Sequence, residues 1–439
     1  MLSVLANRTY RHLFWAQVVA LLGTGLATIA LGLLAYNLAA GNAALVLGSI
    51  FTIKMVAYVF VSPVAGAWAD RLPRRTFLVL LDIIRAVVAL LLPFITEVWH
   101  VYVLIFALQS ASAAFTPTFQ ATIPDVLPDE AQYTRALSLS RLAYELENVI
   151  SPALAALLLM ALPYESLFMG TFVGFIASAA LVMSVMLPNP PVLEQRSAYH
   201  RMTKGIRIYL ATPRLRGLLA LNLAAAAAGA MVLVNTVVLV RATLTLSETA
   251  VALTLGCFGA GSMLAAVALP ALLDRVPERR LMVAGAMLMV VALLALAGWV
   301  TAFDLTWVSL LIAWALAGIG YSAALTPSGR LLRRSAHPGD RPALFAAQFS
   351  LSHVCWLMTY PLAGWVMTAA GPVPALLVLS VISAAAIGIS LVIWPAEDIE
   401  ALEHHHDNLP LDHPHLQGER THTHPFVIDE HHARWTARL

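Results

Sequence analysis

The sequence predicts an all-α membrane protein with twelve transmembrane helices arranged as two six-helix halves. The prediction rests on composition, on apolar runs and on an internal repeat. Of the 439 residues, 60% are hydrophobic and only 11% are charged, and the mean hydropathy is +0.80. Because ordinary soluble domains carry about 25% charged residues, this composition excludes a soluble enzyme, a nucleic-acid-binding protein and a disordered scaffold.

Twelve apolar runs are long enough to cross a bilayer, which takes about 20 residues in a helix. Lipid admits only helices or closed barrels, and uninterrupted runs of this length indicate helices. The first run follows Arg8 and Arg11 and exceeds the apolar core of a cleavable signal peptide, so it is expected to be a membrane span. The runs are 12–37, 44–68, 76–96, 101–122, 136–161, 166–187, 217–241, 248–273, 281–301, 305–326, 343–369 and 373–394.

Basic residues fall in alternate loops between these runs. The intervening loops carry almost none, apart from Arg241 at a helix end. Because basic loops favour the cytoplasmic side, both termini are expected in the cytoplasm, and the protein is expected in the bacterial cytoplasmic (inner) membrane. The basic loop residues are Arg71, Arg74, Arg75, Arg135, Arg196, Arg201, Lys204, Arg207, Arg214, Arg216, Arg275, Arg279, Arg280, Arg330, Arg333, Arg334 and Arg341.

An internal repeat divides the chain into two related halves. The loop at 70–75 returns at 274–280, and Thr116-Pro117 returns as Thr326-Pro327, at offsets of 204 and 210 residues. Duplicated six-helix halves are typical of transporters whose substrate site lies at the interface between the repeats. The expected organisation is a first half (1–190), a cytoplasmic central loop (191–215), a second half (216–395) and a polar tail (396–439).

The stretch from Gly66 to Arg75 resembles the G-x-x-x-D-R-x-G-R-R signature of the major facilitator superfamily, with Pro73 at the second glycine. Residues 115–128 are similar to a segment of its drug- and siderophore-exporting branch. The resemblance implies the major facilitator fold and secondary active transport of a small solute, coupled to protons. No zinc-protease, serine-hydrolase or phosphate-loop motif occurs, so neither an enzyme nor a resident cofactor is expected. We expect a monomer that binds no nucleic acid.

The signature loop and its repeat contain a candidate gating latch. A carboxylate near a helix end, with arginines one turn away, can join helix ends in one conformation and release them in another. The alternative is simple anchoring of short loops by positive charge. The candidate latch residues are Gly66, Asp70, Arg71, Arg74, Arg75, Asp274, Arg275, Arg279 and Arg280.

Ionisable residues inside membrane spans are costly and are therefore functional candidates. Lys54 lies in the second span, and Asp82 and Arg85 lie one turn apart in the third, where they can form an ion pair that closes the helix end. A carboxylate without a partner on its own helix, such as Glu147, suits a proton carrier. The candidates for proton coupling or the substrate path are Asp82, Arg85, Arg141, Glu145, Glu147 and His353. His353 is a possible proton acceptor or transient metal ligand, or else a histidine hydrogen-bonded to a neighbouring helix.

After residue 395 the chain becomes polar and rich in histidine, with acidic residues interspersed. Pairs of the form His-x-His beside carboxylates predict binding of a divalent cation, and the absence of cysteine and methionine favours Ni(II), Zn(II), Co(II) or Cu(II) over Cu(I). The candidate metal ligands are His404, His405, His406, His413, His415, His422, His424, His431 and His432.

The combination of this tail with the predicted fold resembles nickel-resistance exporters of the same superfamily. That resemblance implies proton-driven efflux of nickel or a similar divalent cation, with the tail collecting or sensing the metal. The alternative is proton-coupled efflux of a drug, siderophore or metabolite, in which the tail is a metal sensor. The few polar residues expected to face the interior include no ring of carboxylates or thiols suited to holding a cation.

Overall fold

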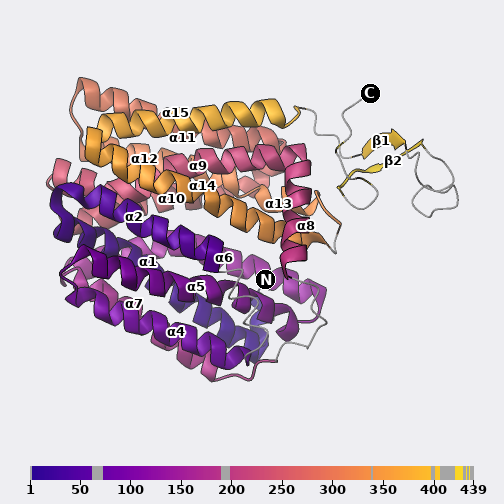
Figure 1. The fold of residues 1–439 in the computed structure, drawn as a ribbon, viewed down its shortest axis with the longest axis horizontal. Coiled ribbons are helices and arrows are strands. Elements are labelled where there is room, and N and C mark those ends of the chain that lie inside the picture. Colours follow the sequence, from indigo (N-terminus) through magenta and orange to yellow (C-terminus); the bar gives the residue numbers. More distant parts are fainter. Residues whose placement is uncertain are drawn as a thin grey trace.

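The computed structural model describes residues 2–61, 73–188, 198–337, 340–396, 401–405, 421–428, 432 and 435. In this part of the chain, twelve long helices form two groups of six that lie side by side, followed by a two-stranded hairpin outside the bundle (Figure 1). The two groups follow one another in sequence. The predicted all-α membrane fold with two six-helix halves is therefore confirmed.

The first half consists of six long helices with short additional turns. It comprises η1 (Leu2–Ala6), α1 (Arg8–Ala39), η2 (Ala40–Asn42), α2 (Ala43–Val56) with its continuation η3 (Ala57–Val61), α4 (Arg74–Leu91), η4 (Leu92–Phe94), α5 (Val98–Val126), α6 (Glu130–Leu159) and α7 (Glu165–Met183).

The second half repeats this pattern after a connecting helix, α8 (Ala198–Ala211). It comprises α9 (Pro213–Val238) with its continuation η5 (Leu239–Thr243), α10 (Glu248–Leu273), α11 (Glu278–Ala302), α12 (Trp307–Leu325), α13 (Ser328–Arg333), α14 (Arg341–Ala370) and α15 (Pro372–Ile393). The hairpin strands are β1 (Ala401–His405) and β2 (Thr421–Pro425).

Local sequence signals set several helix ends. Asp129 caps α6 by accepting a hydrogen bond from the backbone N–H of Gln132 at 2.9 Å, and Ser247 caps α10 in the same way. Such side chains satisfy backbone donors that a helix leaves unpaired at its N-terminus. Gly371 separates α14 from α15 with φ +84°, a left-handed conformation that glycine adopts without steric cost.

Ten of the described helices are long and apolar enough to cross a membrane. The other two long helices, α6 and α14, have 30 residues each and contain a proline, Pro152 or Pro361. They occupy corresponding places in the two halves, and both pack against the opposite half, α6 on α10 and α14 on α2. A helix that faces other protein rather than lipid can carry more polar residues, which explains their lower hydropathy.

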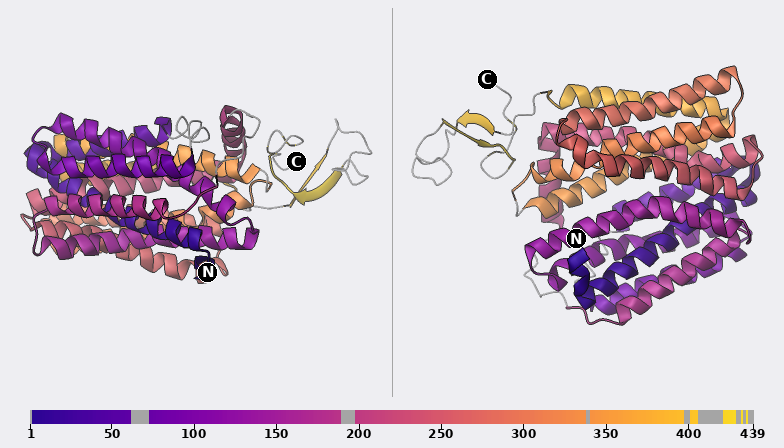
Figure 2. Two further views of the ribbon diagram at one scale, coloured as in Figure 1. Left: turned by 90° about the horizontal axis from the view of Figure 1, so that it is seen from below. Right: turned by 180° about the vertical axis from the view of Figure 1, so that it is seen from behind.

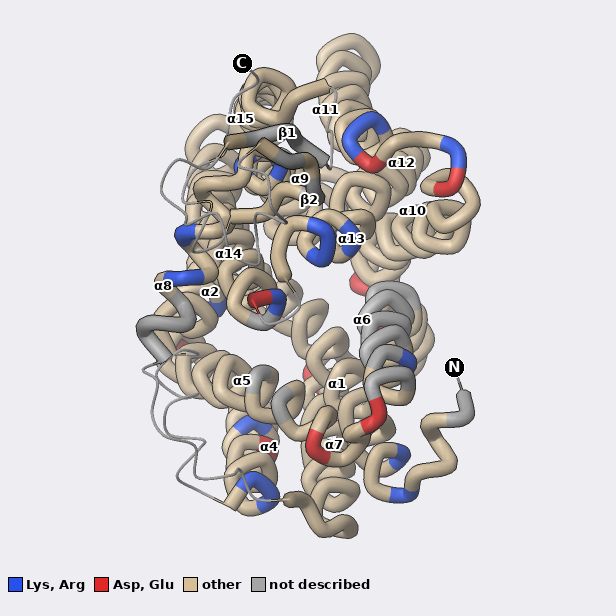
Figure 3. Tube along the Cα trace, turned by 90° about the vertical axis from the view of Figure 1, so that its right-hand side faces the viewer, with Lys and Arg blue, Asp and Glu red and all other residues tan. Residues whose placement is uncertain are grey.

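The short helix η1 and the hairpin lie at one end of the bundle, together with α8 and α13 (Figures 1 and 2). We call this the basic end, because lysine and arginine residues surround the helix ends seen from that side in Figure 3. The helix α8 packs on α14, where Lys204 pairs with Asp340 at 2.5 Å and the Tyr209 hydroxyl donates to Gln348 Oε1 at 2.5 Å. The central loop of the sequence is thus joined to the second half.

The two halves make close backbone contact near the end opposite the basic end. A Cβ atom placed on Gly364 of α14 would lie 2.4 Å from the carbonyl oxygen of Ala44 of α2, and one on Gly48 would lie 2.8 Å from the carbonyl oxygen of Tyr360. Small residues let membrane helices approach closely. This contact therefore closes the opposite end between α2 and α14.

A methyl group at this contact is expected to destabilise the protein. Gly364→Ala should lower the free energy of unfolding by about 1–3 kcal/mol, the usual effect of overpacking. Gly298→Ala is the matched control, because nothing lies within 4 Å of a Cβ at Gly298 on α11; it should be neutral or stabilising by about 0.5–1 kcal/mol. Thermal unfolding of the purified protein in detergent measures both, and equal effects would contradict the close contact.

Candidate substrate and coupling site

Two opposite charges from different helices of the first half interact inside the bundle. Lys54 lies on α2 and Glu147 on α6, and their charges attract each other. Both side chains are half-buried. Glu147 also adjoins α1, since its Cγ lies 3.5 Å from the place that a Cβ on Gly25 would occupy. An ionisable residue at this depth is costly, and the attraction between the two charges offsets part of that cost for each.

Tyr58 and His353 extend this pair across to the second half. Their rings stack with centroids 5.2 Å apart and an interplanar angle of 2°. Lys54 Nζ lies 6.0 Å from the centroid of the Tyr58 ring, and its charge also acts on His353. The Tyr58 hydroxyl also lies near Thr116 of α5. Residues of α2, α5, α6 and α14 are thereby connected at the interface of the halves.

One ring nitrogen of His353 is already engaged. Nδ1 lies 2.6 Å from the carbonyl oxygen of Phe349, one turn earlier on α14, so Nδ1 carries the proton in the neutral ring and donates it to that oxygen. Nε2 is then the acceptor nitrogen of this tautomer. The alternative expected from the sequence was a hydrogen bond to a neighbouring helix, whereas this hydrogen bond is made to α14 itself. Its roles as proton acceptor or metal ligand stay predictions.

Aromatic side chains continue from this point along the interior of the second half. Trp356 lies on the Tyr360 ring with centroids 5.0 Å apart, and Tyr321 of α12 meets Trp356 at 6.3 Å. Phe258 of α10 meets Tyr321 at 5.6 Å. Phe258, Tyr321 and Trp356 are half-buried, so each keeps surface that a solute can contact. We call these four residues the aromatic series.

The pair of Asp82 and Arg85 lies apart from this interface, within the first half. Arg85 donates to Asp82 one turn away on α4, and Ser178 of α7 donates to the same carboxylate at 2.8 Å. The guanidinium lies over the rings of Phe115 and Phe175, 4.1 and 4.5 Å from their centroids. Asp82 is fully buried. This enclosure suits the ion-pair interpretation, and a role in proton coupling stays a prediction.

Two further coupling candidates, Arg141 and Glu145, are on α6 one turn from each other, and Glu147 follows on the same helix. The side chains of Arg141 and Glu145 lie outside the described part of the structure. Their part in proton coupling therefore stays a prediction from the sequence.

The latch candidates of the first half are described in part. Gly66, Asp70 and Arg71 lie outside the described residues. Arg74 pairs with Asp125 at the end of α5, and Arg75 donates to the carbonyl oxygen of Met183 at the C-terminus of α7. These contacts join α4 to the other helices of its own half. A switching role for them stays a prediction.

The second half repeats these contacts with one reversal of charge. Arg279, the counterpart of Arg75, donates to the carbonyl oxygens of Leu391 and Trp394 at the end of α15, at 3.1 and 3.0 Å. Glu278, the counterpart of Arg74, pairs with Arg330 at 3.3 Å and Arg334 at 3.4 Å. In the first half the acidic residue of the pair is Asp125, at the end of α5, whereas in the second half it is Glu278, at the start of α11. The remaining candidates, Asp274, Arg275 and Arg280, are exposed.

The histidines of the tail separate into groups. His404, His405, His422 and His424 belong to the paired strands β1 and β2, and His432 is buried, with 4% of its surface exposed. His406, His413, His415 and His431 lie outside the described residues. Among the described residues, no group of three histidine, cysteine, aspartate or glutamate side chains is placed to hold a metal ion.

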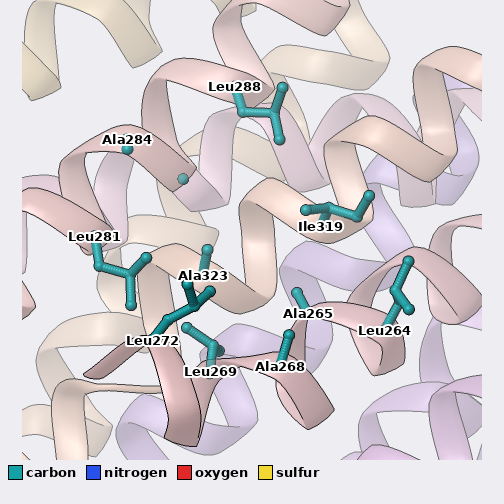
Figure 4. Close-up of a pocket in the computed structure, with 11 residues that line it drawn as sticks. Leu264, Ala265, Ala268, Leu269, Leu272, Leu281, Ala284, Leu288, Ile319 and Ala323 are labelled. Atoms are coloured by element: carbon teal, nitrogen blue, oxygen red, sulfur yellow. The ribbon is translucent and has the colours of Figure 1, made fainter. Parts of the chain in front are cut away.

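A cavity of about 290 Å³ lies between α10, α11 and α12 (Figure 4). Its walls are aliphatic, so it offers no partner for a charge or a hydrogen bond, and it lies within the second half rather than between the halves. It is therefore a poor candidate for the transport site. The lining residues are Leu264, Ala265, Ala268, Leu269, Leu272, Leu281, Ala284, Gly285, Leu288, Ile319 and Ala323.

Comparison with known proteins decides the family. Residues 13–239 and 218–410 each match the Major Facilitator Superfamily, so both halves carry its pattern. The chain belongs to the major facilitator superfamily. It is thus a multi-pass membrane transporter and not an enzyme, as the sequence predicted. The structure agrees with a crystal structure of a peptide transporter of the POT family (TM-score 0.70, 10% identity, 88% of this chain and 95% of the other).

A second similar structure is a bacterial homologue of the human lysosomal transporter Spinster (TM-score 0.66, 14% identity, 88% of this chain and 96% of the other). Curated relatives are the macrolide efflux protein A of Streptococcus pyogenes, 24% identical over 40% of this chain, and the uncharacterized MFS-type transporter YfiS of Bacillus subtilis (strain 168), 27% identical over 34%. The alignments span 45% and 35% of these relatives' own lengths. The chain thus spans less than half the length of the curated relatives it matches.

Nothing in the sequence singles out Tyr58 or connects Lys54 with Glu147. Lys54 stood out as an intramembrane charge, which is a usable signal. Tyr58 carries no such signal, because a tyrosine in an apolar run is an ordinary packing residue. Only the packing of α2 against α14 reveals its contact with His353.

The interaction of Lys54 with Glu147 predicts a characteristic pattern of stability. Lys54→Met and Glu147→Gln should each lower the free energy of unfolding, because one charge is left in the interior without its partner, by about 1–3 kcal/mol. The double variant should recover most of that loss, since replacing both partners removes the uncompensated charge. Thermal unfolding in detergent measures the cycle, with Glu97→Gln, at an exposed position, as control. Additive losses would contradict the pairing.

Proposed function

We propose that the protein exports an organic solute with apolar or aromatic surface, driven by protons entering the cell. The observation that supports this most is the position of the Lys54–Glu147 pair beside Tyr58, His353 and the aromatic series at the interface of the halves. Rings with accessible faces bind apolar and aromatic groups well. We further propose that the protein works as a monomer in a bacterial inner membrane, with its basic end and both termini in the cytoplasm.

The proposed coupling uses the carboxylate of Glu147. Protonation neutralises that carboxylate and removes its attraction to Lys54, so the charge balance between α2 and α6 changes with each proton. Lys54 also acts on His353 of α14, which gives the change a route to the second half. In a superfamily whose halves rock around a central site, such a change can favour one orientation over the other.

Export of a divalent cation such as nickel is the second candidate. Its support is the set of nine histidines in the tail, which would collect metal on the cytoplasmic side. Against it, the described part of the membrane domain holds no group of three potential ligands. The aromatic series therefore favours an organic solute as cargo, with the tail as a metal-binding regulator.

One experiment separates the two candidates. The full chain and a 1–395 truncation are expressed in an efflux-deficient bacterium, and accumulation of aromatic dyes is measured beside cell-associated Ni, Co, Zn and Cu. Lower dye accumulation with unchanged metal content supports the proposal. Lower metal content with unchanged dye supports the second candidate and overturns the first.

Glu147 is expected to be essential for coupling. Glu147→Gln should abolish the dependence of export on the pH gradient, because the amide cannot take up a proton, while solute exchange down its own gradient continues. Glu97→Gln, at an exposed site of the opposite end, should transport like the unaltered protein. Transport into everted vesicles, with and without an imposed pH gradient, measures both. Full pH-driven transport by Glu147→Gln would refute this role.

Trp356 is expected to contribute to solute binding. Trp356→Ala should raise KM for an aromatic solute about three- to tenfold, since an aromatic contact is worth about 0.5–1.5 kcal/mol beyond its buried area. Trp99→Ala is the control, because Trp99 is 60% exposed at the far side of the first half. Initial rates over a range of dye concentrations measure KM, and an unchanged value would remove Trp356 from the binding surface.

A further inference from the structure

Arg241 is the exception in the alternation of basic loops along the sequence. It belongs to η5, the continuation of α9, and therefore lies at the end of the bundle opposite the basic end. Basic residues are normally kept on the cytoplasmic side of a membrane, and that side is expected at the basic end. An arginine at the opposite end therefore needs a local reason, which its contacts supply.

The guanidinium of Arg241 lies over an aromatic ring of the first half. Its central carbon is 5.6 Å from the centroid of the Tyr36 ring, near the C-terminus of α1. At this distance a cation is attracted to the face of an aromatic ring. Since α1 is the first helix of its half, as α9 is of the other, the contact joins equivalent helix ends of the two repeats across their interface.

Two glutamates, one from each half, place negative charge beside this contact. Glu248, the first residue of α10, attracts Arg241 and is repelled by Glu165, the first residue of α7. All three side chains are half-buried, so water screens their charges only in part. The repulsion between the glutamates favours separation of the halves at this end, and the positive charge of Arg241 offsets it.

The backbone around Arg241 is irregular and helps to hold its side chain in place. The turn η5 is π-helical, and Thr245 after it has φ +54°, which is unusual for a β-branched residue. Arg241 Nη1 donates to the carbonyl oxygen of Leu246 at 2.7 Å, whereas its buried Nε has no hydrogen-bond partner among the described residues. Irregular backbone of this kind costs free energy and is found mostly at functional sites.

We propose that Arg241 and Tyr36 form a lock between the halves, which holds the end opposite the basic end closed and separates each time that end opens. The packing of α2 on α14 closes the same end through small residues, and the lock adds a charged contact between η5 and α1. One cation–π contact at a partly exposed site is weak, so it biases the equilibrium between closed and open states without fixing it. The lock requires only that the two ends open in turn, and it does not depend on which solute is carried.

The experiment measures the distance between the halves at this end in the full-length protein. Spin labels are attached to cysteines introduced at Ala161 and Ala302, which are exposed residues just after α6 and at the end of α11. Cys257 and Cys355 are first replaced by alanine, so that only the introduced cysteines carry labels. Double electron–electron resonance in detergent then gives the ratio of the closed population, with the shorter distance, to the open one.

Loss of either partner should shift the equilibrium toward the open state. Tyr36→Leu should lower the ratio of closed to open populations about two- to fivefold, the effect of losing one weak cation–π contact. Arg241→Gln should lower it at least as much, because Glu248 then faces Glu165 without a compensating charge. The double variant should match Arg241→Gln alone. Tyr36→Phe is the matched control: it keeps the ring and should leave the ratio unchanged.

Two results would overturn the lock. An unchanged ratio in Tyr36→Leu would show that Arg241 only anchors its helix end at the membrane surface. Additive effects of Tyr36→Leu and Arg241→Gln would show that the two residues act separately. Because the distance measurement needs no solute, dye export by the same variants is measured in parallel, and failure of the lock is thereby distinguished from failure of the proposed export.

Discussion

Pairing of charges inside the bundle is the constraint on which the rest of this structure depends. A charge in a membrane interior is expensive, and the described spans meet that cost in two different ways. Asp82 and Arg85 are enclosed by α5 and α7, with a serine and two aromatic rings around them. Lys54 and Glu147 are half-buried at the interface of the halves. The enclosed pair holds helices of one half together, whereas Lys54 and Glu147 are the charges at which we propose proton coupling.

The contacts that recur in both halves indicate which interactions hold the helices of each half together. In both halves an arginine at the start of the third helix donates to the C-terminal carbonyls of the sixth, Arg75 to α7 and Arg279 to α15. The neighbouring ion pair persists although its charges are exchanged, from Arg74 with Asp125 to Glu278 with Arg334. Retention of the contact despite the exchange indicates that it fixes helices within each half. Movement is then left to the interface, where α2 meets α14 and α6 meets α10.

Sequence reasoning succeeded where the signal is local. Apolar runs gave the long helices, and the spacing of Asp82 and Arg85 gave their ion pair, because residues three apart on a helix are neighbours. It could not connect Lys54 with Glu147 or Tyr58 with His353, since these contacts depend on how distant helices pack. The same limit applies to the repeat: the sequence places Glu278 opposite Arg74, but only the structure reveals that both residues form ion pairs at the starts of their helices.

For the tail, composition predicts a type of binding but no particular residues. Nine histidines beside acidic residues predict metal binding by any of them, and composition cannot rank them. Pairing of β1 with β2 places positions 404, 422 and 424 on one face of the hairpin and position 405 on the other, and His432 is buried apart from them.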